Sequence, residues 1–167
     1  MGLLMTVLDQ GIINKYRRVS ERLADSALSA ELRALFDRKY TVAELLSWVH
    51  EKVKWDDGEI QRHNDPLEIL NYGRGRCGEF SILFTALCLA HGHRARLILD
   101  MSDHVWTEVW DPVKSKWMHI DPSEKRMDDP LMYERDWKKN LTEIYAFENG
   151  EAEDVTKDYK MCTDCTR

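Results

Sequence analysis

The sequence predicts an α+β fold in which N-terminal helices are followed by an antiparallel sheet. Three observations carry this prediction: apolar residues recur at helical spacing in the first half, strand-like segments begin after Gly92, and a hairpin turn signal occurs at Asn149-Gly150. The chain has 167 residues, 43% of them hydrophobic, which is the size of one globular domain with its own core. We therefore expect a single domain.

The helical half divides into short elements. Apolar residues at steps of three and four predict a first helix from Leu4 to Leu23, with Leu8 on its apolar face, and a second around Leu32 to Phe36. Thr41 and Glu44 have the spacing of a capping box, in which each side chain accepts a hydrogen bond from the other residue's backbone N–H. A third helix should therefore begin there.

Cys77 is the candidate nucleophile. It follows a glycine-rich segment and precedes a run with helical spacing that Gly92 can end, so we expect it at a helix N-terminus. Unpaired N–H groups and the partial positive charge there favour a thiolate, and one such N–H could stabilise the oxyanion of a tetrahedral intermediate. The alternative is a buried structural cysteine, which is common among cysteines generally.

The strands supply a base and a group that orients it. We predict strands at 95–99, 104–110 and 117–121, and a four-residue loop between the last two would put residue 123 opposite His104. Asp121 would then be a diagonal neighbour of His104 on the same face of the sheet. A catalytic cysteine requires a histidine whose second ring nitrogen donates a hydrogen bond to a carboxylate. Cys77, His104 and Asp121 are thus the predicted catalytic triad, with His119 as the alternative base.

Two further residues are candidates for substrate contact. Trp106, like other tryptophans of these strands, could line a groove, although strand aromatics more often fill the core, and Glu79 lies close to the nucleophile in sequence. Cys162 and Cys165 have the spacing of a zinc or redox pair but supply only two ligands. We therefore expect a solvated tail, no metal and no other cofactor.

Composition limits the partners and the location. The chain has 30 acidic and 24 basic residues, so its net charge of −6 leaves no excess of cations for a phosphate backbone, and we expect no nucleic acid. Asp9 interrupts the apolar start of the chain before it reaches signal-peptide length, and no segment reaches the length of a membrane span. The cysteines are then expected to be reduced and the protein cytoplasmic. The sequence leaves the oligomeric state open.

From Asp65 to Tyr159 the chain resembles the catalytic core of the peptide:N-glycanases. The resemblance lies in these segments, which follow the family's order: Pro66-Leu67-Glu68-Ile69-Leu70, Gly73 to Glu79, Asp103 to Val109, His119-Ile120-Asp121, Pro130 to Glu134 and Asp154-Val155-Thr156. It implies a papain-like, transglutaminase-like fold with Cys77, His104 and Asp121 as the triad. It also implies cleavage of the amide between an N-glycan and asparagine, which leaves aspartate and a glycosylamine, so protein, peptide or glycopeptide substrates are expected.

The chain also departs from that family. No cysteine occurs between Trp55 and Pro66, where eukaryotic members carry a zinc lobe, and Phe80 replaces a usual tryptophan. A transglutaminase-like cysteine protease or protein-glutamine acyltransferase is therefore the alternative function. We expect a helical extension over residues 1–40, a transglutaminase-like catalytic core over 41–160 and a tail over 161–167.

Overall fold

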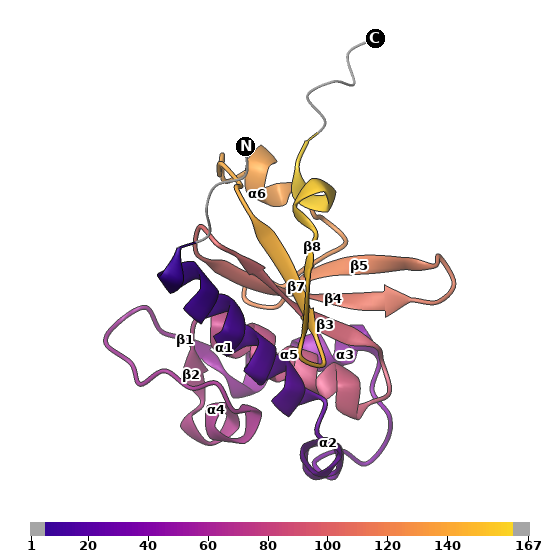
Figure 1. Ribbon diagram of the computed structural model, residues 1–167. Coiled ribbons are helices and arrows are strands. Elements are labelled where there is room, and N and C mark those ends of the chain that lie inside the picture. Colours follow the sequence, from indigo (N-terminus) through magenta and orange to yellow (C-terminus); the bar gives the residue numbers. More distant parts are fainter. Residues whose placement is uncertain (1–5, 162–167) are drawn as a thin grey trace.

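The computed structural model describes residues 6–161 and shows helices packed against one sheet (Figure 1). This confirms the predicted α+β class with an antiparallel sheet. The helices are α1 (Val7–Leu23), α2 (Ser26–Arg33), α3 (Val42–Lys52), α4 (Pro66–Tyr72), α5 (Cys77–Ala90), α6 (Met132–Arg135) and a 3₁₀ turn, Thr156–Tyr159. The strands are β1 (Lys54–Trp55), β2 (Arg74–Gly75), β3 (Ala95–Asp100), β4 (His104–Asp111), β5 (Lys116–Asp121), β6 (Arg126–Met127), β7 (Ile144–Glu148) and β8 (Glu151–Asp154).

The main sheet has the strand order β6-β5-β4-β3-β7-β8, with antiparallel neighbours throughout. Strand β4 pairs with β5 in the register expected from the four-residue loop, with Trp110 opposite Trp117. The Asn149-Gly150 turn joins β7 to β8 and sets Tyr145 opposite Asp154, which is the register of a hairpin with a two-residue turn. A separate parallel pair, β1 with β2, was not predicted, because two-residue strands carry no periodic pattern.

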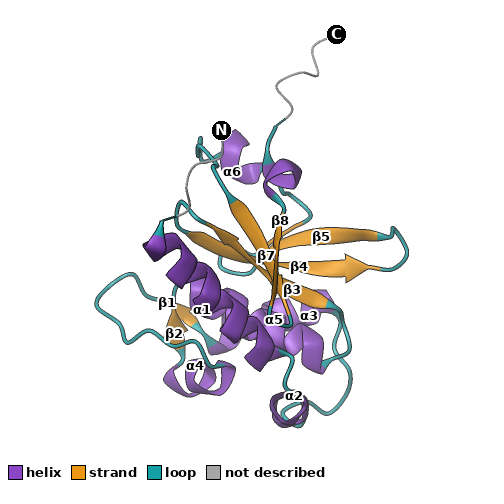
Figure 2. Cartoon of the chain, viewed as in Figure 1, coloured by secondary structure: helices purple, strands orange, loops and turns teal. Residues whose placement is uncertain are grey.

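Helix α5 is the centre of the fold. Its residues from Gly78 to Cys88 are all buried, as expected for a helix that is apolar on every side. It packs on strands β3 and β4 and is surrounded by α1, α2, α3 and α4, which Figure 2 shows gathered below the sheet. The helices and one face of the sheet thus enclose the larger core.

A second apolar cluster lies on the opposite face of the sheet. It contains Ile98 and Trp106 from the strands, and residues after Met132 cover them, among them Tyr133 and Tyr159. The sheet is therefore buried on both faces near the start of β4. His104 is the first residue of β4 and lies close to Cys77, the first residue of α5.

Most helices begin and end where the sequence predicted, but the structure corrects the predicted burial of Leu8 and the predicted end of the second helix. Thr41 and Glu44 form the predicted capping box at the start of α3, and Gly92 follows α5 with a positive φ of 79°. Leu8, expected on the apolar face of α1, is 74% exposed, because the helix turns Ile13, Tyr16, Val19 and Leu23 inward. Helix α2 ends at Arg33, short of the expected Phe36.

Helices α1 and α2 contribute to the larger core, together with α3, α4 and α5. The predicted division at residue 41 therefore stays a prediction, and the predicted start of the first helix at Leu4 lies outside the described residues. Over residues 6–161, every helix is too short or too polar to cross a bilayer.

Replacing Phe84 by alanine should lower the free energy of unfolding by about 3–5 kcal/mol, because the ring is wholly buried in α5. Urea denaturation measures this change, and Val113→Ala is the matched control, since Val113 is 93% exposed and should change stability by less than about 0.5 kcal/mol. A loss at Phe84 no larger than the loss at Val113 would show that α5 is not the centre of the core.

Candidate functional site

The N-terminus of α5 is held by Glu79. Its buried carboxylate accepts a hydrogen bond from the Arg76 backbone N–H at 2.9 Å and pairs with Arg62 through two bonds of 2.6 and 3.0 Å. Burial opposes the charge on Glu79, but the Arg62 guanidinium and the backbone N–H groups keep the pKa of this carboxyl below its usual range. A Cβ at Gly75 would overlap the Glu79 side chain, so glycine is required there. Cys77 therefore opens a fixed helix, as predicted.

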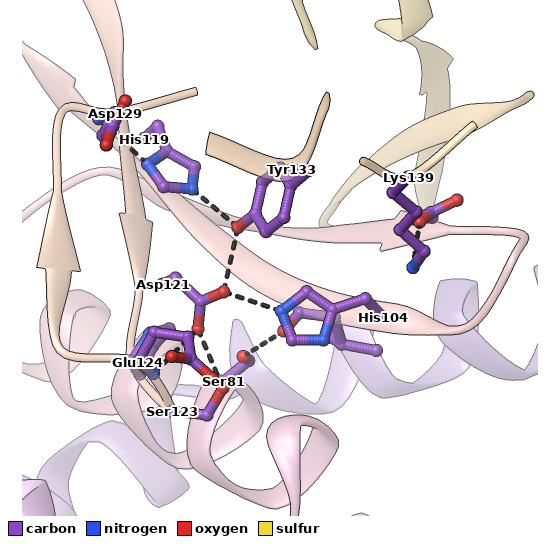
Figure 3. A network of polar contacts seen from close by, with 12 residues as sticks. Ser81, His104, His119, Asp121, Ser123, Glu124, Asp129, Tyr133 and Lys139 are labelled. Atoms are coloured by element: carbon purple, nitrogen blue, oxygen red, sulfur yellow. Dashed lines mark hydrogen bonds and ion pairs between the residues drawn. The ribbon is translucent and has the colours of Figure 1, made fainter. Parts of the chain in front are cut away.

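Asp121 is the centre of the polar network in Figure 3. It has no solvent exposure, and it accepts hydrogen bonds from Ser123 Oγ at 2.8 Å, the Glu124 N–H at 3.2 Å, the Tyr133 hydroxyl at 2.9 Å and His104 Nε2 at 2.6 Å. Burial raises the pKa of a carboxyl, but these donors outweigh it and hold the pKa of Asp121 below its usual value. Asp121 is a buried carboxylate.

His104 lies between this carboxylate and the thiol. Its Nε2 meets Asp121, which leaves Nδ1 for Cys77. Burial works to lower the pKa of His104, but the hydrogen bond with Asp121 and the nearby Cys77 side chain outweigh it and raise the pKa to about 9. The rings of Tyr133 and Trp137 enclose the imidazole, with centroids 5.5 and 5.0 Å away. The structure thus brings together the three residues predicted as a triad.

His119, the alternative base, has a different place in the network. The Asp129 backbone N–H donates to His119 Nδ1 at 3.2 Å, so the ring carries its proton on Nε2. That proton is donated to the Tyr133 hydroxyl at 2.7 Å, and Tyr133 donates its own to Asp121. Burial lowers the pKa of His119 to about 4 and keeps it neutral. His119 therefore supports Asp121 through Tyr133.

The sequence analysis assigned no role to Tyr133, and its prediction that Trp106 lines a substrate groove disagrees with the structure. Trp106 is wholly buried and stacks on Tyr133 at 4.4 Å, so the prediction that it contacts substrate conflicts with its position. The cause is the cover that Tyr133 and Tyr159 place over this face of the sheet. Glu79 borders a cavity, but Arg62 and the Arg76 N–H occupy its oxygens, and a contact with substrate stays a prediction.

Apart from Cys77, the described part of the chain contains one cysteine, which lies outside the polar network. Cys88 is wholly buried, and desolvation raises the pKa of its thiol. Cys162 and Cys165 lie outside the described residues. Among residues 6–161, no group of three or more His, Cys, Asp or Glu side chains is arranged to hold a metal ion.

Known proteins with similar sequences share this region. The curated relatives are peptide-N(4)-(N-acetyl-beta-glucosaminyl)asparagine amidases: that of Oryza sativa subsp. japonica is 47% identical over 57% of this chain and 21% of its own length. The Homo sapiens amidase is 45% identical over 65% of this chain and 19% of its own, and the Drosophila melanogaster amidase is 41% identical over 62% and 16%. The chain therefore spans about a fifth of the length of these relatives.

Solved structures and family models agree on the fold. A Rad4-Rad23 complex bound to a 6-4 photoproduct UV lesion matches with a TM-score of 0.68 and 17% identity, over 90% of this chain and 47% of that one. At this identity the likeness shows the fold alone. A Rad4 transglutaminase-like domain model matches residues 101–166, and the model described as the transglutaminase-like superfamily matches residues 26–122. Since the latter match covers more than half of the sequence, the chain belongs to the transglutaminase-like superfamily.

Proposed function

We propose that this protein is a thiol-dependent amidase of the peptide:N-glycanase type, which hydrolyses the amide between an N-glycan and an asparagine side chain. One observation carries the proposal: the buried Asp121 carboxylate holds His104 by a hydrogen bond of 2.6 Å, and Cys77 at the start of α5 lies close enough to raise the pKa of the imidazole. The identity of 41–47% to the asparagine amidases supports the choice of amide.

The mechanism proceeds in two steps. His104 takes the Cys77 proton, and the thiolate attacks the amide carbon to give a tetrahedral intermediate, whose oxyanion is stabilised by a backbone N–H at the start of α5. The C–N bond then breaks, and the imidazolium of His104 protonates the departing glycosylamine, which leaves a thioester on Cys77. Water, deprotonated by His104, hydrolyses this thioester to aspartate and the free thiol.

In the second candidate function, the acyl-enzyme forms on Cys77 from a peptide or glutamine donor and passes to water or to an amine. A cysteine protease would release a peptide amine, and a protein-glutamine acyltransferase would transfer the acyl group to an amine. The missing cysteines between Trp55 and Pro66 favour this candidate, whereas the identity to the asparagine amidases favours the glycanase.

The proposed partner is a protein, peptide or glycopeptide. The Rad4-Rad23 complex is bound to a UV lesion, but the net charge of −6 on this chain argues against a phosphate backbone as its ligand. The cytoplasmic location stays a prediction.

Incubation with a denatured N-glycoprotein should release the glycan and convert the glycosylated asparagine to aspartate, as identified by mass spectrometry. Cys77→Ala should abolish the conversion without unfolding the protein, because the thiol supplies the nucleophile. Cys88→Ala is the matched control and should keep activity, since Cys88 is buried away from the network. Conversion by Cys77→Ala would refute the nucleophile, and amine incorporation into glutamine without deglycosylation would favour the second candidate function.

The two histidines can be told apart by the reactivity of Cys77. His104→Ala should slow its alkylation by iodoacetamide at neutral pH, because the thiolate loses the imidazolium beside it. His119→Ala should slow the rate less than His104→Ala does, since His119 reaches the site only through Tyr133 and Asp121. The rate is followed on the Cys77 peptide by mass spectrometry. A slow rate in His119→Ala with a normal rate in His104→Ala would show that the base is assigned to the wrong histidine.

A further inference from the structure

The turn that precedes His104 has an uncommon backbone conformation. Strands β3 and β4 pair as far as Asp100 and His104, which lie opposite each other, so residues 101–103 form the turn between them. Asp103 has a positive φ of 89°, which a non-glycine residue rarely adopts. Such a strained conformation persists only where the surrounding contacts hold it. The contacts around this turn therefore also fix the start of β4.

Asp100, a second wholly buried carboxylate, holds this turn. Its Oδ1 accepts hydrogen bonds from the Ser102 backbone N–H at 2.9 Å and from the Ser102 hydroxyl at 2.8 Å. Its Oδ2 lies 2.6 Å from the ammonium of Lys139 (Figure 3). The Lys139 side chain is 21% exposed, so the ion pair is largely shielded from water. Loss of either partner would leave a costly unpaired charge, so the pair holds the two parts of the chain together.

Lys139 belongs to the 137–143 segment, which contacts both His104 and the turn before it. The ring of Trp137 lies edge-on to the His104 imidazole, with the centroids 5.0 Å apart. At the other end of the segment, the Glu143 carbonyl accepts a hydrogen bond from the Met101 backbone N–H at 3.0 Å. Between these contacts, the wholly buried Leu141 packs in the second apolar cluster. The segment is thus attached to the sheet on both sides of Lys139.

We propose that Lys139 and Asp100 are positioning residues for the catalytic histidine. Their ion pair ties the 137–143 segment to the β3–β4 turn, and this tie keeps the His104 ring in place between Asp121 and Cys77. Both residues act through the backbone of the turn and through the Trp137 ring. The inference rests on the proposed function in one respect, since it takes His104 as the base of Cys77.

The test is the pH profile of Cys77 alkylation by iodoacetamide. Lys139→Gln should move the profile upward by about half a pH unit or more, because a displaced imidazolium stabilises the thiolate less. This shift corresponds to about threefold less thiolate at neutral pH. Lys139→Arg should keep the wild-type profile, because a guanidinium can still pair with Asp100. Lys138→Gln is the matched control: it removes the same charge from the next residue, whose ammonium donates to the Arg135 carbonyl at 2.7 Å, and it should leave the profile unchanged.

A double variant, Asp100→Asn with Lys139→Gln, excludes two other causes of a shift. It leaves no unpaired charge at this buried position, so the protein should still fold. It also leaves the net charge unchanged, so a shift in its profile cannot come from an altered charge near Cys77. The profile should move upward as in Lys139→Gln, because a hydrogen bond between two neutral amides is weaker than a charge-assisted one.

A wild-type profile in Lys139→Gln or in the double variant would overturn the proposal; with a lower midpoint of urea denaturation, it would mean that the pair only stabilises the fold. Equal shifts in Lys139→Gln and Lys138→Gln would overturn it too, since the change of charge alone would then explain them. So would a shift in Lys139→Arg as large as that in Lys139→Gln. These measurements use no glycoprotein, so the proposal can fail while the glycanase assay succeeds, or succeed while that assay fails.

Discussion

A wholly buried carboxylate, Asp121, is the constraint on which the site depends. A charge withdrawn from water costs several kcal/mol unless donors replace the solvent. Asp121 accepts a hydrogen bond from each of Ser123, the Glu124 N–H, Tyr133 and His104. These donors come from strand β4, from the turn after β5 and from α6. The carboxylate is therefore stable only when these separate parts of the chain are in place.

The direction of the hydrogen bonds follows from the same constraint. Asp121 can only accept, so Tyr133 must donate to it, and His119 must in turn donate to Tyr133. The Asp129 N–H fixes the tautomer of His119 that makes this possible. Because His119 is buried and neutral, the network adds no second positive charge near His104. Of the two histidines in this network, His104 is therefore the one that carries a charge.

Both faces of the sheet contribute to this arrangement. On one face, α5 presents Cys77 from its N-terminus and is anchored to the strands, for instance by Ser81 Oγ, which donates to the Val105 carbonyl at 2.9 Å. On the other face, Tyr133 and Tyr159 cover Trp106, and the Tyr133 hydroxyl donates to the buried Asp121. The polar network around Asp121 and the packing on both faces of the sheet are thus parts of one structure.

Local patterns predicted the parts of the site that lie on regular elements. The loop between β4 and β5 determines the register, and the register makes Asp121 a diagonal neighbour of His104. Helical spacing after Cys77 likewise located the start of α5. Tyr133 could not be found in this way, because α6 has only four residues and no periodicity.

The burial of Trp106 was equally hidden from local patterns, since it depends on residues that follow Met132 in the chain. The same holds for Leu8, whose exposure depends on which side of α1 meets the core. Strand alternation and helical spacing identify a face of an element, but they do not say what covers that face.

The most direct test is the titration of the His104 imidazole by NMR, in the wild type and in Asp121→Asn. If the buried carboxylate stabilises the imidazolium, His104 should titrate near the expected pKa of about 9 in the wild type. In Asp121→Asn its pKa should fall by more than about one unit, because the carboxylate's charge is lost and Cys77 would be left as the main group that opposes burial. A wild-type pKa near the ordinary value of 6.5, or a pKa unchanged in Asp121→Asn, would contradict the account.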